Sequence, residues 1–241
     1  AEVAVMNRDD MQVMAMNAGT RNIFFTLSVP QSQDDFGIDE YEGKQWLCRG
    51  NEKLCTTDSL LIAGKHNVAN ALAALALGAV AGLSMDAMLA ALKRFTGLPH
   101  RTQYVAEIQA VTYYNDSKAT NTGACIAALT GLDKADQSRS IVILGGDCKD
   151  ADFSGLTAVI QDTCRAVVLI GRDADQVKQH LPADIEFVTA NSMSDAVSLA
   201  QRLATKGDRV VLSPACARFD MFRNFEDRGE QFIAAVNGLM S

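Results

Sequence analysis

The stretch Val111-Thr-Tyr-Tyr-Asn-Asp-Ser-Lys-Ala-Thr-Asn-Thr-Gly123 shows the pattern on which the later part of the chain is built. Residues 111–114 are β-branched and aromatic, which favours a strand. Residues 120–122 offer hydroxyl and amide N-caps directly before an apolar run, which indicates the start of a helix. The stretch therefore predicts a strand, a polar loop and a helix, with Asp116 and Lys118 in the loop.

The position of this loop gives it a possible chemical role. In α/β sheets, ligands bind at the carboxyl ends of strands, and the helix start that follows offers free N–H groups to anions. Asp116 and Lys118 would then lie where chemistry occurs. The alternative is that residues 115–117 form an ordinary turn and that Lys118 is a solvated charge. The stretch alone does not separate these two interpretations.

Strand and helix signals alternate after the break at Thr96-Gly97-Leu98-Pro99, where we place a domain boundary. This spacing predicts a parallel, doubly wound sheet that opens with an antiparallel pair of strands. The predicted strands cover residues 102–108, 111–115, 140–144, 166–170, 185–188 and 209–213, and the predicted helices cover residues 123–132, 153–164, 174–181, 194–205 and about 224–239.

The part before the break carries short strand signals and two helices. Strands are expected at residues 3–6, 22–29, 37–41 and 45–49. An Ala-rich helix is expected over residues 67–83, followed by a second helix over residues 85–95 that Ser84 caps. The first helix is short for a membrane span and contains polar Asn70, so we expect a buried helix.

Composition narrows the class of protein. The chain has 241 residues, 48% of them hydrophobic, and a formal net charge of −7, which argues against a nucleic-acid partner. Its six cysteines contain no C-x-x-C pair and its three histidines stand apart, so neither a zinc site nor a disulfide framework is expected. The early charges around Arg8 do not fit a signal peptide. We expect a cytoplasmic protein without a membrane span.

Two further loops follow predicted strands and carry polar residues. Gly145-Gly-Asp-Cys-Lys149 contains a glycine pair that allows positive φ and close approach of a ligand, although a plain tight turn is the commoner reason for such a pair. The loop over residues 213–219 contains Arg218 and Phe219. Because the carboxyl ends of parallel strands share one edge, these loops and Asp116 would form one crevice, suited to a carboxylate or a phosphate.

Other candidates lie close to the predicted domain boundary. Asn67 and Asn70 are three residues apart at a helix start, so both side chains lie on one face and could contact an adenine edge. The commoner alternative is that Asn67 is the N-cap and Asn70 makes a core hydrogen bond. Arg101 could bind a nucleotide or cover a seam between domains. The sequence contains no G-x-x-x-x-G-K-[ST] phosphate loop.

Five motifs taken together resemble one protein family. The chain is similar to the Mur ligases of peptidoglycan synthesis, and most similar to the members that add D-glutamate. The motifs are Gly64-Lys-His-Asn-Val-Ala-Asn-Ala71, Gly97-Leu-Pro-His-Arg101, Asn115-Asp-Ser-Lys-Ala-Thr-Asn121, Gly145-Gly-Asp-Cys-Lys149 and Ser213-Pro-Ala-Cys-Ala217, with Phe222-Arg-Asn-Phe-Glu-Asp-Arg-Gly229 as a supporting tail.

This resemblance implies part of a three-domain enzyme. Residues 1–97 would be the C-terminal part of a central α/β ATPase domain, and residues 98–241 a Rossmann-like domain that binds the incoming amino acid. The chain opens without Met and reads as cut from a longer one. The phosphate loop and the Mg²⁺ ligands would lie upstream. The whole enzyme would use ATP and Mg²⁺ to join D-glutamate to UDP-N-acetylmuramoyl-L-alanine through an acyl phosphate, and this piece alone would be inactive.

The resemblance also implies roles for single residues. Nucleotide contacts would come from Asn67, Asn70, Arg101 and Asp116, and catalytic cations from Lys118 and Lys149. D-Glutamate contacts would come from Thr120, Lys149, Arg218, Phe219 and Phe225. Arg218 departs from the family pattern, in which a Ser usually stands at that position. No metal ligand is expected within the chain.

Two other functions stay open at this point. One is a related ATP-dependent ligase for another amino acid, such as another Mur ligase or a folylpolyglutamate synthetase. The other is a nucleotide-binding module without catalysis. The oligomeric state is not predicted.

Overall fold

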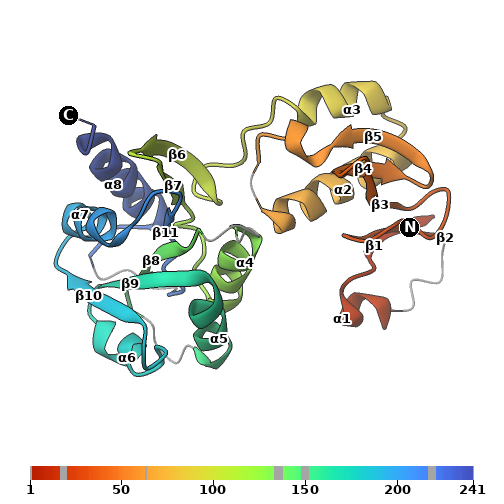
Figure 1. Ribbon diagram of the computed structural model, residues 1–241. Coiled ribbons are helices and arrows are strands. Elements are labelled where there is room, and N and C mark those ends of the chain that lie inside the picture. Colours follow the sequence, from red (N-terminus) through yellow and green to blue (C-terminus); the bar gives the residue numbers. More distant parts are fainter. Residues whose placement is uncertain are drawn as a thin grey trace. The chain divides into compact units, whose positions relative to one another are not determined.

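The computed structural model describes residues 2–16, 21–62, 64–132, 138–147, 152–216 and 221–240. The chain forms two compact units, residues 1–96 and residues 97–241 (Figure 1). Each unit has its own sheet and its own hydrophobic core, and each is described separately below.

The first unit is a five-stranded sheet with helices packed against it. Its strands follow the order β1-β2-β3-β4-β5; the first three run parallel, and β3, β4 and β5 are antiparallel neighbours. The elements are β1 (Val3–Asn7), α1 (Met11–Met14), β2 (Arg21–Phe25), β3 (Phe36–Tyr41), β4 (Lys44–Arg49), β5 (Glu52–Thr56), the 3-10 helix η1 (Thr57–Ser59), α2 (Lys65–Val80) and α3 (Met85–Leu92).

Apolar side chains from the sheet and from α2 form the core of the first unit. Phe36 and Leu47 from the sheet and Leu72 and Leu75 from α2 are almost fully buried. The sequence signals missed β5, which returns from β4 through a turn at Gly50 with φ of 52°. β5 escaped notice because its polar residues lie at the exposed end of the strand.

The second unit is a six-stranded sheet in the order β10-β9-β8-β11-β7-β6. Every neighbouring pair is parallel except β6 and β7. The elements are β6 (Gln103–Ile108), β7 (Val111–Asn115), α4 (Thr122–Leu132), β8 (Ser140–Gly145), α5 (Ser154–Thr163), β9 (Cys164–Ile170), α6 (Ala174–Lys178), β10 (Glu186–Ala190), α7 (Met193–Leu203), β11 (Arg209–Leu212) and α8 (Phe225–Gly238).

Helices cover both faces of this sheet, as strand β8 makes clear. Ile141 and Ile143 point to a core formed with α7 and α8, whereas Val142 and Leu144 point to a core formed with α4, α5 and α6. Figure 1 shows α7 and α8 on one side of the strands and α4 and α5 on the other. Successive strand residues point to opposite faces, so a strand buried on both faces reads as a continuous apolar run. The predicted doubly wound α/β fold is confirmed.

Two expectations from composition can be compared with the structure. Cys48, Cys55, Cys125 and Cys164 are free and buried. Cys216, however, is disulfide-bonded, so the chain contains a disulfide that its cysteine spacing did not predict. The remaining cysteine, Cys148, lies outside the described residues. Among the helices of the described ranges, none is long and apolar enough to cross a membrane.

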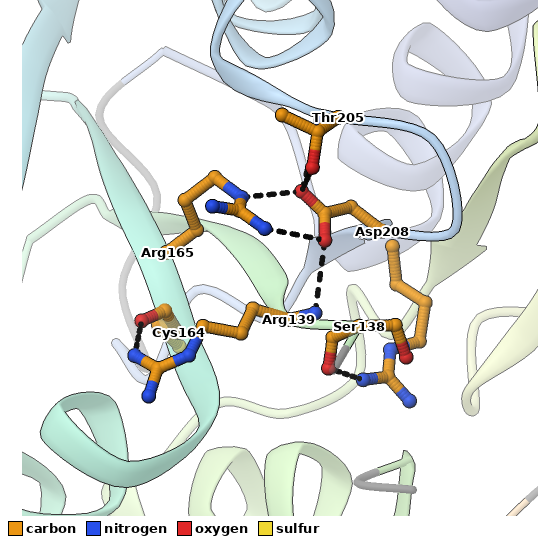
Figure 2. Close-up of polar contacts among 7 residues, drawn as sticks. Ser138, Arg139, Cys164, Arg165, Thr205 and Asp208 are labelled. Atoms are coloured by element: carbon orange, nitrogen blue, oxygen red, sulfur yellow. Dashed lines mark hydrogen bonds and ion pairs between the residues drawn. The ribbon is translucent and has the colours of Figure 1, made fainter. Parts of the chain in front are cut away.

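Asp208 joins the amino ends of the three strands β11, β8 and β9. Its carboxylate is 1% exposed and accepts hydrogen bonds from the backbone N–H of Arg139, at 2.9 Å, and from the guanidinium of Arg165, at 2.5 and 3.1 Å (Figure 2). The N–H and the hydroxyl of Thr205 also donate to this carboxylate. Burial opposes ionisation of Asp208, but these donors together hold the pKa of its carboxyl below the ordinary value. This carboxylate is a structural link at the edge of the sheet opposite the carboxyl ends of its strands.

We predict that Asp208→Asn lowers the free energy of unfolding at neutral pH by about 2–4 kcal/mol, because it leaves buried donors without their charged acceptor. The lowered pKa means that this stabilisation is present above about pH 4 and is lost as the pH falls further. Urea unfolding at several pH values measures both effects.

The matched control is Asp184→Asn, which removes an exposed carboxylate from the same unit. It should change the unfolding free energy by less than about 0.5 kcal/mol. Equal effects of the two substitutions would contradict the structural role of Asp208.

Candidate functional site

Three loops meet at the carboxyl ends of β8, β11 and β7, which are neighbours in the sheet. The N–H of Asp116 donates to the carbonyl of Leu212 at 2.8 Å, and the N–H of Gly145 donates to the carbonyl of Pro214 at 3.0 Å. The N–H of Ala215 donates to the carbonyl of Ala119 at 3.0 Å. The structure therefore brings together the three loops that the sequence analysis placed at one edge.

Asp116 is the most strongly perturbed acid of this edge. Its carboxyl is 7% exposed and accepts hydrogen bonds from the N–H of Thr102, at 2.9 Å, and from the Oγ of Ser213, at 3.1 Å. Burial raises the pKa of Asp116 to about 6, although the hydrogen bonds from Thr102 and Ser213 and the nearby charge of Arg101 oppose that rise. Buried acids with raised pKa values are typical of functional sites.

Ser117 fixes the same loop to the last helix of the chain. Its Oγ donates to the carbonyl of Phe225 at 2.8 Å. Arg228 of α8, which is 1% exposed, donates from Nε to that Oγ at 2.9 Å and from a terminal nitrogen to the Ser117 carbonyl at 2.7 Å. These bonds satisfy the loop backbone and hold Asp116 and Lys118 on either side of Ser117 in place.

Lys118 and Phe225 are in direct contact. The ammonium of Lys118 lies 3.5 Å from the centre of the Phe225 ring, and the ring of His100 packs edge-on against Phe225 with centroids 5.7 Å apart. A cation above an aromatic face is attracted by the ring. Two residues predicted to serve different ligands are thus parts of one cluster.

Both glycines at the carboxyl end of β8 have positive φ, as such a pair allows. Gly145 and Gly146 have φ values of 124° and 137°. A Cβ on Gly145 would lie 2.0 Å from the carbonyl oxygen of Ile170, so no other residue fits there. The carboxylate of Asp147 forms an ion pair with Arg172 at 2.5 Å.

Thr120 lies in the loop between β7 and α4 and is partly buried. The helix itself is capped by its neighbour Asn121, whose Oδ1 accepts from the N–H of Ala124 at 2.8 Å. The hydroxyl of Thr120 therefore does not serve as this helix cap. It stays a candidate for a ligand contact.

Asn67 and Asn70 lie in the first unit, in the first two turns of α2. The alternative of an Asn67 cap is wrong, because Gly64, with φ of 95°, is the N-cap of this helix. The alternative of a core position for Asn70 is also wrong, since Asn70 is exposed. Its amide donates to Oδ1 of Asn67 at 3.5 Å, so both side chains do lie on one face.

The remaining predicted residues divide into two groups. Arg101 is exposed and stands between two buried residues, His100 and Thr102. Lys149, Arg218 and Phe219 lie outside the described residues.

The sequence analysis gave no role to Arg228, although helical periodicity indicates one. Arg228 shares a helix face with the buried residues Phe232 and Val236, at spacings of four and eight residues, so helical periodicity places its charge in the core. A charge in such a position needs partners, and the Ser117 loop supplies them. The positive φ of Thr102, 43°, has no comparable sequence signal.

Within the described ranges, no group of three or more His, Cys, Asp or Glu side chains could hold a metal ion. The site offers instead a carboxylate that accepts hydrogen bonds, and cations at Lys118 and Arg101. This combination suits hydroxyl groups and anions.

Comparison with known proteins gives consistent results. Residues 100–216 match the family described as Mur ligase, glutamate ligase domain. The UDP-N-acetylmuramoylalanine–D-glutamate ligase of Nitrosococcus oceani is 47% identical over 238 residues, which is 98% of this chain and 52% of that protein. The ligase of the same name from Pseudomonas aeruginosa is 47% identical over 240 residues, 99% of this chain and 53% of that protein. The chain thus spans about half the length of these curated relatives.

Solved structures show the same fold at lower identity. A pseudomurein peptide ligase type C from Methanothermus fervidus superposes with a TM-score of 0.68 at 13% identity, over 98% of this chain and 56% of that one. Folylpolyglutamate synthase from Mycobacterium tuberculosis, in a complex with ADP and AMPPCP, superposes with a TM-score of 0.66 at 19% identity. The match covers 99% of this chain and 55% of that one.

We predict that Asp116→Asn makes the protein more stable at pH 7.5 by about 1–3 kcal/mol, at 1.36 kcal/mol per unit of pKa shift. The folded protein holds the Asp116 proton up to about pH 6, whereas the unfolded chain loses it near pH 4. Stability of the parent therefore falls as the pH rises through this window, and the uncharged variant escapes that loss. Urea unfolding at about pH 4.5 and 7.5 measures the free energy of unfolding of both proteins. If the difference between variant and parent is the same at both pH values, the burial of this acid is contradicted.

We predict that Gly229→Ala lowers the unfolding free energy by about 1–3 kcal/mol, because overpacking displaces its neighbours. A Cβ at Gly229 would lie 2.1 Å from Nδ1 of His100 and 2.9 Å from Nδ2 of Asn115. Gly238→Ala in the same helix is the control, since no atom lies within 4 Å of its Cβ position. It should be neutral or slightly stabilising. Thermal unfolding compares the two, and equal losses would show that α8 does not pack closely on His100.

Proposed function

Because residues 100–216 match the glutamate ligase domain of the Mur ligases, we propose that this chain is the C-terminal part of an ATP-dependent ligase that adds D-glutamate to UDP-N-acetylmuramoyl-L-alanine. The observation that carries the proposal is the 47% identity, along nearly the whole chain, to two proteins with that name. The joined loops after β7, β8 and β11 support it, because they form an edge suited to anionic ligands.

Our proposal assigns the two units to different parts of such an enzyme. Residues 1–97 form the end of a central ATPase domain, and residues 98–241 form the domain that receives the amino acid. The sequence has no phosphate loop, so the nucleotide phosphates and Mg²⁺ are bound mainly by a preceding part of the enzyme, and the chain alone is inactive. A cytoplasmic location is part of this proposal, because ATP and UDP-sugars are cytoplasmic substrates.

The nucleotide contacts follow from the chemistry of the side chains. Asp116 accepts hydrogen bonds from ribose hydroxyls, and Lys118 and Arg101 supply cations for the phosphates. Asn67 and Asn70 present amides on one face of α2, which suits the donor and acceptor pattern of an adenine edge. The carboxylate and cations of the second unit therefore suit a ribose and its phosphates, and the amides of the first unit suit an adenine.

The amino-acid contacts are assigned from residue types. Thr120 offers a hydroxyl to the carboxylates of D-glutamate, and Lys149 offers a positive charge. Phe225 stands in the first turn of α8, and a helix start suits an anion. Arg218 and Phe219 complete the set. Arg218 replaces the usual Ser and can pair with a carboxylate through two parallel hydrogen bonds.

In the reaction, ATP supplies the phosphoryl group that converts the carboxylate of the UDP-linked substrate into an acyl phosphate. The D-glutamate amine then attacks the acyl carbon, an amide bond forms, and phosphate leaves. The contribution of this chain is to hold D-glutamate in place and to stabilise developing negative charge with Lys118 and Lys149. Both lysines therefore act as catalytic cations in the proposal.

The test is a chimera in which this chain replaces the matching half of the Pseudomonas aeruginosa relative. We expect phosphate release from ATP, with UDP-N-acetylmuramoyl-L-alanine present, to depend on D-glutamate and not on L-glutamate, L-lysine or glycine. Release driven by another amino acid would assign a different ligase. A folded chimera that shows no release, beside an active parent, would overturn the proposal.

We also predict that Lys118→Ala in this chimera lowers kcat by about a hundredfold or more, because a charge aimed at the transition state is lost. The matched control is Lys178→Ala, since Lys178 also lies over a phenylalanine ring, that of Phe187 at 4.9 Å, but on α6. It should leave kcat within about twofold, as expected for a side chain away from the chemistry. Similar losses in both variants would remove Lys118 from the catalytic group.

A further inference from the structure

The segment that leads into the second unit is fastened to the candidate site. Residues 97–102 are Gly-Leu-Pro-His-Arg-Thr, and they precede β6. Thr102 is 6% exposed, and both its N–H, at 2.9 Å, and its Oγ1, at 3.4 Å, face Oδ1 of Asp116. The chain thus enters the second unit through direct contact with the carboxylate at the centre of the site.

This segment is also strained. His100 has φ of 63° and Thr102 has φ of 43°, although neither is glycine. The left-handed region is uncommon for such residues, and for a β-branched residue like Thr it is a true outlier. A conformation of this kind costs free energy and persists only where its surroundings hold it. The bonds to Asp116 are part of what holds Thr102.

A second attachment lies two residues earlier. The carbonyl of His100 accepts from the N–H of Lys118 at 3.0 Å, and Nδ1 of His100 lies 3.0 Å from Nδ2 of Asn115. Its ring packs on Phe225. His100 is therefore held by packing as well as by hydrogen bonds, whereas the Thr102 N–H is held by the Asp116 carboxylate.

The acceptor sites of Asp116 are nearly all in use. A carboxylate offers about four lone-pair sites. Two donors of Thr102 face Oδ1, and the hydroxyl of Ser213 occupies one site on Oδ2. A ligand with two adjacent hydroxyls would need two sites on a group that is only 7% exposed. It must displace at least one donor, and the donors on Oδ1 belong to the strained segment.

We propose that Asp116 has a second function as a latch, which fastens residues 100–102 in the free protein and releases them when a ligand diol takes its carboxylate. Binding at Asp116 and freedom of residues 100–102 are then coupled, and each changes the equilibrium of the other. Release lets Thr102 leave its strained backbone, which offsets part of the lost hydrogen bonding. Release by a ligand rests on the proposed nucleotide site, whereas the fastening of residues 100–102 rests on the contacts described above.

The experiment measures amide hydrogen exchange at Thr102 by NMR in the 241-residue chain. In Asp116→Ala we expect exchange at Thr102 to speed up by about tenfold or more, since its N–H loses its acceptor. Asp116→Asn retains an acceptor oxygen and should restore most of the protection. The control Asp195→Ala removes another carboxylate that accepts a backbone N–H, that of Asn191 at 3.0 Å, and should leave Thr102 unchanged.

Saturating Mg-ADP tests whether a bound ligand releases residues 100–102. We expect it to speed up exchange at Thr102 in the parent chain and not in Asp116→Ala, where the latch is already open. Unchanged exchange at Thr102 in Asp116→Ala would overturn the latch. Bound Mg-ADP that leaves Thr102 protected would overturn the coupling. If Mg-ADP does not bind while Asp116→Ala still opens Thr102, the latch is upheld and it is the nucleotide role of Asp116 that fails.

Discussion

The candidate site depends on one buried contact between residues far apart in the sequence. Arg228, in the last helix, donates two hydrogen bonds to Ser117, in the loop after β7. A guanidinium with 1% exposure is costly unless its donors are used, so the loop and the helix stabilise each other. Because Asp116 and Lys118 flank Ser117, the geometry of the site is set by α8 as well as by the sheet. The chain must fold to its end before this loop is fixed.

The two buried carboxylates of the second unit show how the two edges of one sheet differ. Asp208 has enough donors to overcome burial, and its pKa is lowered. Asp116 has fewer donors for its degree of burial, and its pKa is raised to about 6. A fully compensated acid stabilises the fold, whereas an undercompensated acid is typical of a functional site. The edge with Asp208 is accordingly structural, and the edge with Asp116 is suited to ligands.

Much of the fold could be predicted, because its signals are local. The continuous apolar runs of β8, β9 and β11 and the intervening helical windows predicted a parallel sheet, and the order 8-11-7 then brings three polar loops together. Strand β5 was missed because a mainly polar strand lacks a hydrophobic pattern. The N-cap of α2 was misplaced because Gly64 caps without a side chain.

The parts of the site that sequence could not predict are those created by tertiary contacts. Nothing in the residue type of Thr102 indicates a positive φ, since that conformation exists only while Asp116 and its neighbours hold it. Similarly, the raised pKa of Asp116 follows from its burial, which outweighs the hydrogen bonds from Thr102 and Ser213, and strand and helix signals do not report that burial. The resemblance to a family named candidate residues, but the structure alone shows that Phe225, Lys118 and His100 share one cluster.

The central claim is the proposal that this chain binds a nucleotide through Asp116. Calorimetric titration with Mg-ADP, for the parent and for Asp116→Ala, tests it most directly. We predict binding by the parent that weakens by about tenfold or more in the variant, equivalent to at least about 1.4 kcal/mol. A folded parent chain that gives no binding heat at any temperature tried, or a variant that binds as tightly as the parent, would contradict the account.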